Sequence, residues 1–459
     1  MYQLDFKHPI HVHFIGIGGI SMSGLAKILL SQQFTVSGSD SKESDLTRDL
    51  AQKGATIFYG QKEENILPGI DLVVYTAAIH ENNAELMAAK EKHIPLLSRA
   101  ELLGQIMENY EKSIAVAGTH GKTTTTSMIS QILLTAKADP TITVGGILPA
   151  IGDNLRIGSS DLFVLEACEY TNSFFHFYPK YNVILNVEED HLDFFKDLED
   201  IRHSFRHYAG NTKPYGATII NGTIQNWQEL VADMPQEIVT YGLSSDFDFY
   251  AVNIAYDEKA CASFTAMHHD TPIGEFHLGV PGEHNVGNAL AAIAVSVLMQ
   301  LPNDAIVTGL SDFHGANRRF EKKGCIDGVT VFDDYAHHPT EIRSTLLAAK
   351  KYPHKRLVVV FQPHTYSRTK AFLKEFASAL SLADVIILAD IYAAREQNTY
   401  GVSSKDLLAL LQSGNKEAYY FPSFEEIEKF LLKKCMNGDL LITMGAGNVV
   451  EIGEALLGQ

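Results

Sequence analysis

Residues 114–127 read IAVAGTHGKTTTTS, an apolar run that breaks at a glycine-rich turn and continues into a row of threonines. This order predicts a buried strand, a tight turn and the start of a helix, which together aim backbone N–H groups and the positive helix end at one point. The turn is therefore predicted to bind a phosphate group. Lys122 adds a cation there, and Thr123 adds a hydroxyl suited to Mg²⁺.

The motif is a shortened form of the phosphate-binding loop. The full pattern has a glycine five positions before the glycine of GK, and Val116 stands at that position here. The alternative interpretation is an ordinary strand-to-helix turn that happens to contain glycine and lysine. The GKTTTT run directly after an apolar strand favours phosphate binding.

Polar side chains follow two other apolar runs of the same region. Glu166 follows DLFVL, and Asp190 with His191 follows YNVILNV. Open α/β sheets bind ligands at the carboxyl ends of their strands, so these side chains are expected in the same crevice as the glycine turn. A histidine at such a position is also often a hydrogen-bonded structural residue, and that alternative stays open.

A second glycine-rich turn, FIGIGGISMSG, occupies residues 14–24. Gly16 and Gly18 match the dinucleotide fingerprint, Ser21 replaces its third glycine, and Asp40 follows the next predicted strand. The match suggests a nucleotide diphosphate with its ribose nearby, and a purely structural turn is the alternative. Two phosphate sites in one chain suggest two nucleotides, one as fuel and one as a handle on the substrate.

The composition limits the possible functions. The chain has 459 residues, 46% hydrophobic and 20% charged residues, and a formal net charge of −18. This length predicts about three domains. The negative charge argues against nucleic-acid and anionic-membrane partners. Four widely spaced cysteines argue against a disulfide framework, and the absence of a signal-like N-terminus or a long apolar segment predicts a cytoplasmic protein without membrane insertion.

Short β-branched runs alternate with helical stretches throughout the chain, which is typical of parallel sheets covered by helices. Met22, Leu25, Ala26 and Leu29 fall on one face of the first predicted helix. We predict an α/β protein of three domains: a Rossmann-like domain at 1–110, a central phosphate-loop domain at 111–316 and a second Rossmann-like domain at 317–459.

Nine segments in order carry a resemblance to a known family: HFIGIGGISMSG, AGTHGKTTTT, LEACEY, EEDHLDFF, EHNVGNALAA, NRRFE, DDYAHHPTE, FQPHTYSRTK and ADIYAAREQ. Together they resemble the Mur ligases over nearly the whole chain. The resemblance implies three α/β domains that bind in turn a UDP-sugar, ATP and an amino acid, and an ATP-dependent reaction of peptidoglycan precursor synthesis. It implies UDP-N-acetylmuramate and L-alanine as substrates, Mg²⁺ with Mn²⁺ as a substitute, and a monomer or homodimer.

The resemblance also implies roles for matching residues. The residues implied to bind ATP are Gly118, Thr119, His120, Gly121, Lys122, Thr123, Thr124, Asn285, Asn288, Arg319 and Asp334. Those implied to bind metal are Thr123 and Glu166 for a first magnesium ion and His191 for a second metal ion. Those implied to bind the UDP-sugar are Gly18, Gly19, Asp40 and Thr76. Those implied to bind the amino acid are Tyr335, His337 and Arg368, and those implied to act in catalysis are Lys122, Arg319 and His337.

Several simpler interpretations stay open. Asn285 also suits a helix cap, Arg318 suits a solvated neighbour of Arg319, and one of the adjacent His337 and His338 is expected to be structural. Thr365 stands where many relatives have arginine, so glycine, serine or a tripeptide remains a possible acceptor. A nicotinamide-dependent dehydrogenase and a non-enzymatic ATP-gated binding module are the alternative functional classes, but neither explains all of the motifs.

Overall fold

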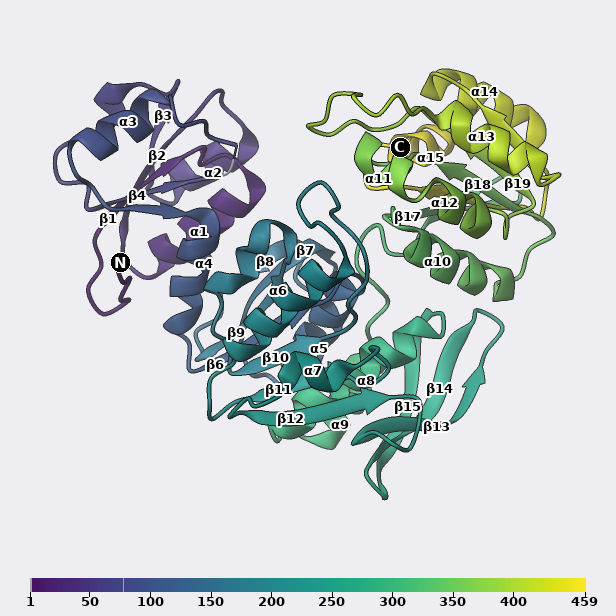
Figure 1. Cartoon of the computed structure of the whole chain (residues 1–459), viewed down its shortest axis with the longest axis horizontal. Helices are drawn as coiled ribbons and strands as arrows, with labels where there is room; N and C mark the ends of the chain where they lie inside the picture. Colours follow the sequence, from purple (N-terminus) through teal and green to yellow (C-terminus); the bar gives the residue numbers. More distant parts are fainter. Residues whose placement is uncertain (1, 77) are drawn as a thin grey trace.

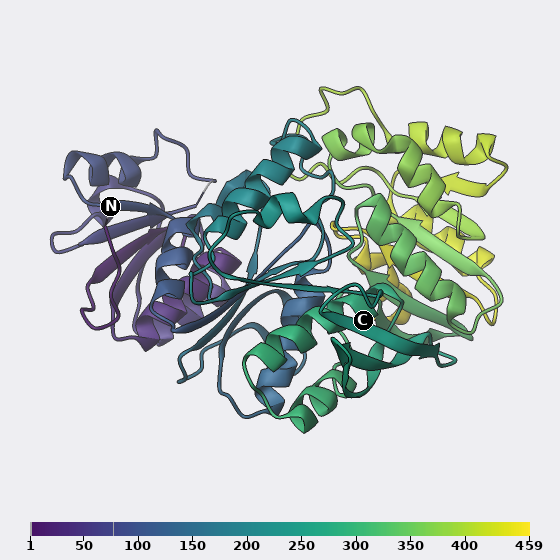
Figure 2. The same cartoon turned by 60° about the horizontal axis from the view of Figure 1, so that its bottom comes forward.

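The computed structural model describes residues 2–76 and 78–459. The described residues form three sheets that follow one another along the chain, each with its own helices. In both views the part that contains the second sheet lies between the other two (Figures 1 and 2). The predicted fold class, three α/β domains, is confirmed, whereas the domain boundaries stay predictions.

The first sheet has the strand order β3-β2-β1-β4-β5, and all of its pairs are parallel. Its strands are β1 (His11–Ile15), β2 (Thr35–Asp40), β3 (Thr56–Tyr59), β4 (Leu72–Tyr75) and β5 (Leu96–Ser98). Its helices are α1 (Ile20–Ser31), α2 (Asp45–Gln52), η1 (Glu63–Asn65), α3 (Ala84–Glu91) and α4 (Arg99–Glu108). The four apolar residues predicted on one face of α1 are buried there. This order is the doubly wound arrangement that binds ligands where the strand order reverses, above β1 and β4.

The second sheet has ten strands in the order β15-β14-β13-β12-β11-β10-β6-β9-β7-β8. The strands are β6 (Lys112–Ala117), β7 (Thr141–Leu148), β8 (Asp153–Arg156), β9 (Leu162–Ala167), β10 (Tyr181–Ile184), β11 (Ala217–Asn221), β12 (Glu237–Gly242), β13 (Phe249–Tyr256), β14 (Cys261–His268) and β15 (Thr271–Pro281). The helices are α5 (Lys122–Thr135), η2 (Tyr170–His176), α6 (Leu198–Gly210), α7 (Trp227–Val231), α8 (His284–Leu298) and α9 (Asn303–Ser311). Strands β6, β9 and β10 are adjacent, so their carboxyl ends meet as predicted.

The third sheet has the order β16-β17-β21-β18-β19-β20. Its strands are β16 (Glu321–Ile326), β17 (Val329–Asp334), β18 (Leu357–Phe361), β19 (Val385–Leu388), β20 (Glu417–Tyr420) and β21 (Leu440–Met444). Its helices are α10 (Pro339–Lys351), α11 (Tyr366–Ala371), α12 (Leu373–Leu380), α13 (Ser404–Ser413), α14 (Phe424–Lys434) and α15 (Val450–Leu457). Alternate residues of β18 enter different cores, because successive side chains point to opposite faces.

The expected parallel pairing does not extend to three edges of the sheets. Strands β13, β14 and β15 pair antiparallel, as do β7 with β8 and β16 with β17. Short connections explain these pairs, since a tight turn can join only antiparallel neighbours whereas a parallel pair needs a long crossover. The antiparallel strands β13–β15 carry the chain to α8, which begins beside the glycine turn of the central sheet.

The first two parts share one continuous core. Buried side chains of α1 and α4 belong to the same cluster as those of β9, η2 and α6. Gly104 of α4 lies so close to η2 that a Cβ there would stand 2.0 Å from the carbonyl oxygen of His176. Any larger residue at position 104 would therefore push the helix away. No helix among the described residues is both long and apolar enough to cross a bilayer.

Candidate active site

The glycine turn lies between β6 and α5 and has the predicted strand-turn-helix form. Gly118 and Gly121 have φ angles of 147° and 84°, which only glycine adopts without strain. The loop after β10 holds the turn from the side: the backbone N–H of His120 donates to Asn186 Oδ1 at 2.7 Å, and Asn186 Nδ2 donates back to the His120 carbonyl at 3.0 Å. Sequence reasoning missed Asn186, although it lies within the YNVILNV run.

Lys122, the first residue of α5, points back over the turn. Its Nζ lies 2.9 Å from Glu169 Oε2 and 3.1 Å from the Thr119 carbonyl, and it also contacts the Gly118 carbonyl. Glu169 is only 2% exposed. Burial alone would lower the pKa of Lys122, but the Glu169 carboxylate raises it, so the ammonium group stays charged. Sequence reasoning missed Glu169, although it stands three residues after Glu166.

Thr123 and Glu166 offer oxygen atoms side by side. Thr123 Oγ1 donates to Glu166 Oε2 at 3.2 Å, and Arg319 Nη2 donates to the same hydroxyl at 3.3 Å. A hydroxyl and a carboxylate beside a phosphate-binding turn are the hard oxygen ligands that Mg²⁺ takes together with nucleotide phosphates. These residues therefore fit a magnesium ion. Arg319 comes from the segment before β16, so the third part of the chain reaches the glycine turn.

A cavity of about 650 Å³ opens beside the glycine turn. The residues of the predicted ATP site that line it are His120, Gly121, Thr124, Asn285, Asn288, Arg319 and Asp334. A Cβ on Gly121 would stand 2.9 Å from Asn288 Oδ1, so glycine is needed there for the turn to approach α8. Pockets of this size and mixed polarity are typical of nucleotide-sized ligands.

Asn285 and Asn288 both lie near the start of α8. Asn285 Nδ2 donates to the Pro281 carbonyl at 2.7 Å, and Asn288 Nδ2 donates to Asn285 Oδ1 at 3.0 Å. The helix-cap alternative for Asn285 is wrong, because Asn285 lies inside the first turn and Glu283 holds the N-cap position.

Asp334 ends β17 at the rim of the cavity. Its two oxygens accept from the backbone N–H groups of Phe320 at 2.8 Å and Ala336 at 2.7 Å. Burial raises the pKa of Asp334 to about 6, against the opposing effect of Arg319. The carboxylate thus joins the segment just before β16 to the segment just after β17.

Tyr335 and His337 follow Asp334 on the same segment. The guanidinium groups of Arg318 and Arg319 lie 4.9 Å and 5.1 Å from the centre of the Tyr335 ring. His337 Nδ1 lies 3.1 Å from the Tyr335 carbonyl, which places the proton of a neutral ring on Nδ1 and leaves Nε2 as the acceptor. Burial lowers the pKa of His337 to about 3, so the ring is neutral at pH 7.

Arg368 lies in α11 and is 8% exposed. Its Nε and Nη2 lie 2.9 Å and 2.8 Å from Asp190 Oδ1, and its Nη1 lies 3.1 Å from His364 Nδ1. Burial alone would raise the pKa of Asp190, but Arg368 lowers it below its usual range. Sequence reasoning did not foresee that the arginine predicted to bind an amino-acid carboxylate would already be paired with an acid of the central sheet.

His191 stands next to Asp190 and adopts a left-handed backbone conformation with φ of 51°. Its Nε2 lies 3.8 Å from both Glu169 Oε1 and Asp190 Oδ2. The geometry therefore connects His191 to Lys122 through Glu169. This position agrees with the crevice expected at the ends of β9 and β10.

Arg318 is not a solvated neighbour of Arg319, so that expectation is wrong. Its Nε donates to the fully buried Asp333 at 2.8 Å, and its two terminal nitrogens donate to the carbonyls of Gly447 at 3.0 Å and Gly445 at 2.8 Å. These contacts join the segment before β16 to residues 445–448 (GAGN), the turn directly after β21. Arg318 thus anchors the segment from which Arg319 extends.

The glycine turn of the first sheet is also built from distant residues. The backbone N–H of Gly18 donates to Asp40 Oδ2 at 2.8 Å, and a Cβ on Gly18 would stand 2.7 Å from that oxygen. A Cβ on Gly16 would stand 3.4 Å from Thr76 Cγ2, and Gly19 caps α1. The predicted UDP-sugar residues therefore lie together above β1, β2 and β4.

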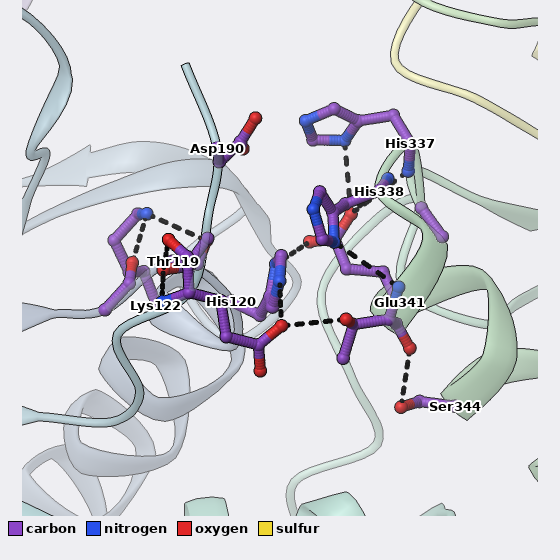
Figure 3. Close-up of polar contacts among 12 residues, drawn as sticks. Thr119, His120, Lys122, Asp190, His337, His338, Glu341 and Ser344 are labelled. Carbon is purple, nitrogen blue, oxygen red and sulfur yellow. Dashed lines mark hydrogen bonds and ion pairs between the residues drawn. The ribbon is translucent and has the colours of Figure 1, made fainter. Parts of the chain in front are cut away.

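Histidine and glutamate side chains meet where the central part contacts α10 (Figure 3). His120 and His338 lie with their ring centres 4.5 Å apart, and His338 Nε2 lies 3.0 Å from the Glu189 carbonyl. His338 also caps α10 through its Nδ1, which accepts from Thr340 N at 3.3 Å. The expectation that one of the two adjacent histidines is structural fits His338, yet this residue also joins two parts of the chain.

Comparisons with known proteins cover the chain from end to end. Three family models match in order: the Mur ligase family catalytic domain at 11–111, the Mur ligase middle domain at 116–296 and the Mur ligase glutamate ligase domain at 318–447. A UDP-N-acetylmuramate--L-alanine ligase of Agathobacter rectalis is 68% identical over 457 residues, which is 100% of both chains. The ligase of the same name from Lachnospira eligens is 57% identical, again over 100% of both.

Solved structures agree with these relatives. The crystal structure of UDP-N-acetylmuramate-alanine ligase from Thermotoga maritima has a TM-score of 0.79 and 29% identity, with 98% of each chain covered. That of a murein peptide ligase from Psychrobacter arcticus has a TM-score of 0.70 and 26% identity, also with 98% of each chain covered. With three matching domains in order and full-length relatives well above 30% identity, the chain belongs to the Mur ligase family.

Proposed function

We propose that this chain is an ATP-dependent ligase that joins L-alanine to the lactyl carboxylate of UDP-N-acetylmuramate in peptidoglycan precursor synthesis. ADP and phosphate are the other products. The observation that carries the proposal is the convergence of Lys122, Thr123 and Glu166 at the ends of β6 and β9, beside a cavity of about 650 Å³. The names of the full-length relatives support alanine as the acceptor.

The first step brings a carboxylate to the terminal phosphoryl group of ATP and forms an acyl phosphate. Two unit negative charges about 4 Å apart repel by about 4 kcal/mol at an effective dielectric of about 20. Lys122 offsets this repulsion from the first turn of α5, and Arg319 adds a second positive charge beside Thr123. Thr123 and Glu166 would hold a first magnesium ion and His191 a second metal ion, and these ions would supply further positive charge for the phosphates.

In the second step the amine of alanine attacks the acyl carbon, and phosphate leaves. The attacking amine must lose a proton, and His337 is the proposed acceptor because its ring is neutral with Nε2 as the open nitrogen. The same low pKa makes His337 a weak base. Replacement of His337 by Asn should therefore slow the second step and leave the first step intact.

The remaining residues bind and orient the substrates. Asn285 and Asn288 hold the adenine side of the cavity, and Asp334 lies at its rim toward the ribose. Gly18, Gly19, Asp40 and Thr76 hold the UDP-sugar at the first sheet. Tyr335 and Arg368 receive the amino acid, and because Arg368 already pairs with Asp190, the incoming carboxylate has to share that guanidinium.

The reaction requires few partners beyond small molecules. We infer Mg²⁺ as the metal, with Mn²⁺ as a substitute, and the cytoplasm as the compartment, because ATP and the UDP-sugar are found there. We expect a monomer or homodimer and no nucleic-acid partner, since the net charge of −18 disfavours polyanions.

The likeness to a murein peptide ligase favours one second candidate, in which a ready-made peptide replaces alanine as the acceptor. An acceptor scan with UDP-N-acetylmuramate, ATP and Mg²⁺ separates the two. ADP release should be fastest with alanine, slower with glycine and serine, and slowest with a tripeptide. A preference for the tripeptide would favour the second candidate.

A further inference from the structure

One largely enclosed carboxylate contacts both the glycine turn and the predicted amino-acid segment. Glu341, in the first turn of α10, has a side chain that is 14% exposed. Its Oε2 accepts from the backbone N–H groups of His337 at 3.0 Å and His338 at 3.3 Å, and its Oε1 lies 3.4 Å from Nδ1 of His120. A single side chain thus spans two parts of the active site.

The opposite edge of the His120 ring meets a second carboxylate. Nε2 of His120 is buried without a hydrogen-bond partner among the described residues and lies 3.4 Å from Glu188 Oε2. That same glutamate oxygen accepts from Thr340 Oγ1 at 2.8 Å, so Glu188 also contacts α10. The ring is therefore enclosed by Glu188, Glu341 and the tilted ring of His338, whose centre lies 4.5 Å away.

The charges in this cluster favour an ionic contact. Burial lowers the pKa of His120, but Glu188 and Glu341 outweigh that effect and raise it to about 9. The ring is therefore positively charged at neutral pH, between two carboxylates. A metal ion is a poorer occupant, because both nitrogens of His338 already have backbone partners.

The contact between Glu341 and His120 reaches the phosphate-binding turn itself. His120 lies between Thr119 and Gly121, at the centre of the turn predicted to bind phosphate, and both His120 and Glu341 line the cavity. On the other side, Glu341 fixes the N–H groups of the segment that carries His337. Glu341 thus contacts His120 of the glycine turn with one oxygen and the backbone of the His337 segment with the other (Figure 3).

We propose that Glu341 is a positioning residue which, through His120, couples nucleotide binding at the glycine turn to amino-acid binding at residues 335–338. The inference rests on the proposed function, because it takes ATP and alanine as the two ligands. Coupling between two sites is reciprocal, so alanine must tighten nucleotide binding by the same factor as nucleotide tightens alanine binding.

The test measures this coupling directly. A non-hydrolysable ATP analogue with Mg²⁺ is titrated into the UDP-N-acetylmuramate complex, with and without saturating L-alanine. Wild type should bind the analogue at least about tenfold more tightly with alanine. Glu341→Gln keeps the shape and an oxygen for the two N–H groups but loses the charge facing His120, and it should reduce the factor to less than about twofold. His120→Gln should do the same, and the double variant should lose no more than either single one.

A matched control separates positioning from general stability. Asp439→Asn removes another buried carboxylate charge of the same domain, where Asp439 pairs with Arg356 just before β21, at the end of that strand away from the cavity. This control should lower the unfolding temperature and leave the coupling factor unchanged.

Three results would overturn the inference. Full coupling in Glu341→Gln, an equal loss in Asp439→Asn, or no effect of alanine in a wild type that makes the amide would each refute it while the proposed function stands. A wild type that makes no amide with alanine would refute the proposed function, and the inference with it.

Discussion

Replacing Lys122 with methionine tests two roles of the ammonium group: its effect on catalysis and its contribution to folding stability. Methionine keeps the length of the side chain and removes its ammonium group. In the native chain that group lies 2.9 Å from Glu169 Oε2, and the Glu169 side chain is 3% exposed. The substitution therefore leaves a buried carboxylate without its cation.

The size of both effects follows from these contacts. Breaking a buried ion pair by removing one partner costs about 3 to 5 kcal/mol of folding stability, because the remaining charge stays desolvated. Loss of the cation at the transferred phosphoryl group exposes a repulsion of about 4 kcal/mol, which corresponds to about a thousandfold loss of rate. UDP-sugar binding should be unchanged, since its residues lie on the first sheet.

The assay compares Lys122→Met with the double variant Lys122→Met/Glu169→Gln. The double variant removes the unpaired charge, so thermal unfolding should show that it recovers most of the lost stability. ADP release should remain about a thousandfold below wild type in both variants. Turnover near the wild-type level in the single variant, or turnover restored together with stability in the double variant, would refute the role of Lys122.

Three further predictions follow from other contacts. The pKa of His120 is about 9 in the folded chain against 6.5 ordinarily, so its charge stabilises the fold by about 3 kcal/mol. This stabilisation is complete below about pH 6.5 and disappears as the pH rises through about 9. The difference in unfolding temperature between wild type and His120→Gln should therefore shrink over that pH range, and a constant difference would contradict the prediction. Arg318→Ala leaves the buried Asp333 unpaired and should cost about 3 to 5 kcal/mol in chemical denaturation, against little for a substituted surface arginine. Gly18→Ala places a Cβ 2.7 Å from Asp40 Oδ2, so calorimetry should show at least about tenfold weaker binding of UDP-N-acetylmuramate and unchanged binding of an ATP analogue. An equal loss of both affinities would refute a clash confined to the first sheet.

The parts of the site that are contiguous in sequence could be predicted well. The turn at 118–121, the start of α5 and the acid at the end of β9 each depend on residues within a few positions of one another. Short β-branched runs likewise indicated the alternation of strands and helices along the chain. Local spacing therefore carried the phosphate-binding prediction without any knowledge of distant contacts.

Long-range pairs could not be predicted in this way. Asp190 and Arg368 stand 178 residues apart, and nothing in either segment identifies the other as its partner. Glu169 contacts Lys122 across 47 residues of sequence, and the chain just after it turns through left-handed backbone conformations at Thr171 and Asn172, with φ of 54° and 55°. Sequence patterns do not reveal such conformations for these residue types.

The antiparallel strands β13–β15 were missed for a different reason. The segments FYAVNIAY and CASFTAMH alternate between buried and more exposed residues over part of their length, a period of two that signals half-buried strands. The alternation of strands and helices elsewhere in the chain does not indicate antiparallel strands of this kind. These strands lead into α8, so their position also determines how Asn288 approaches Gly121 of the glycine turn.

The central claim is that the glycine turn of the central sheet holds ATP so that its terminal phosphoryl group activates a carboxylate for attack by alanine. The most direct measurement incubates the purified chain with UDP-N-acetylmuramate, ATP, Mg²⁺ and L-alanine and quantifies amide product and ADP together. The account predicts equal amounts of amide and ADP, and ADP release that depends on both the UDP-sugar and alanine. No amide, or ADP release that continues unchanged without the UDP-sugar, would contradict it.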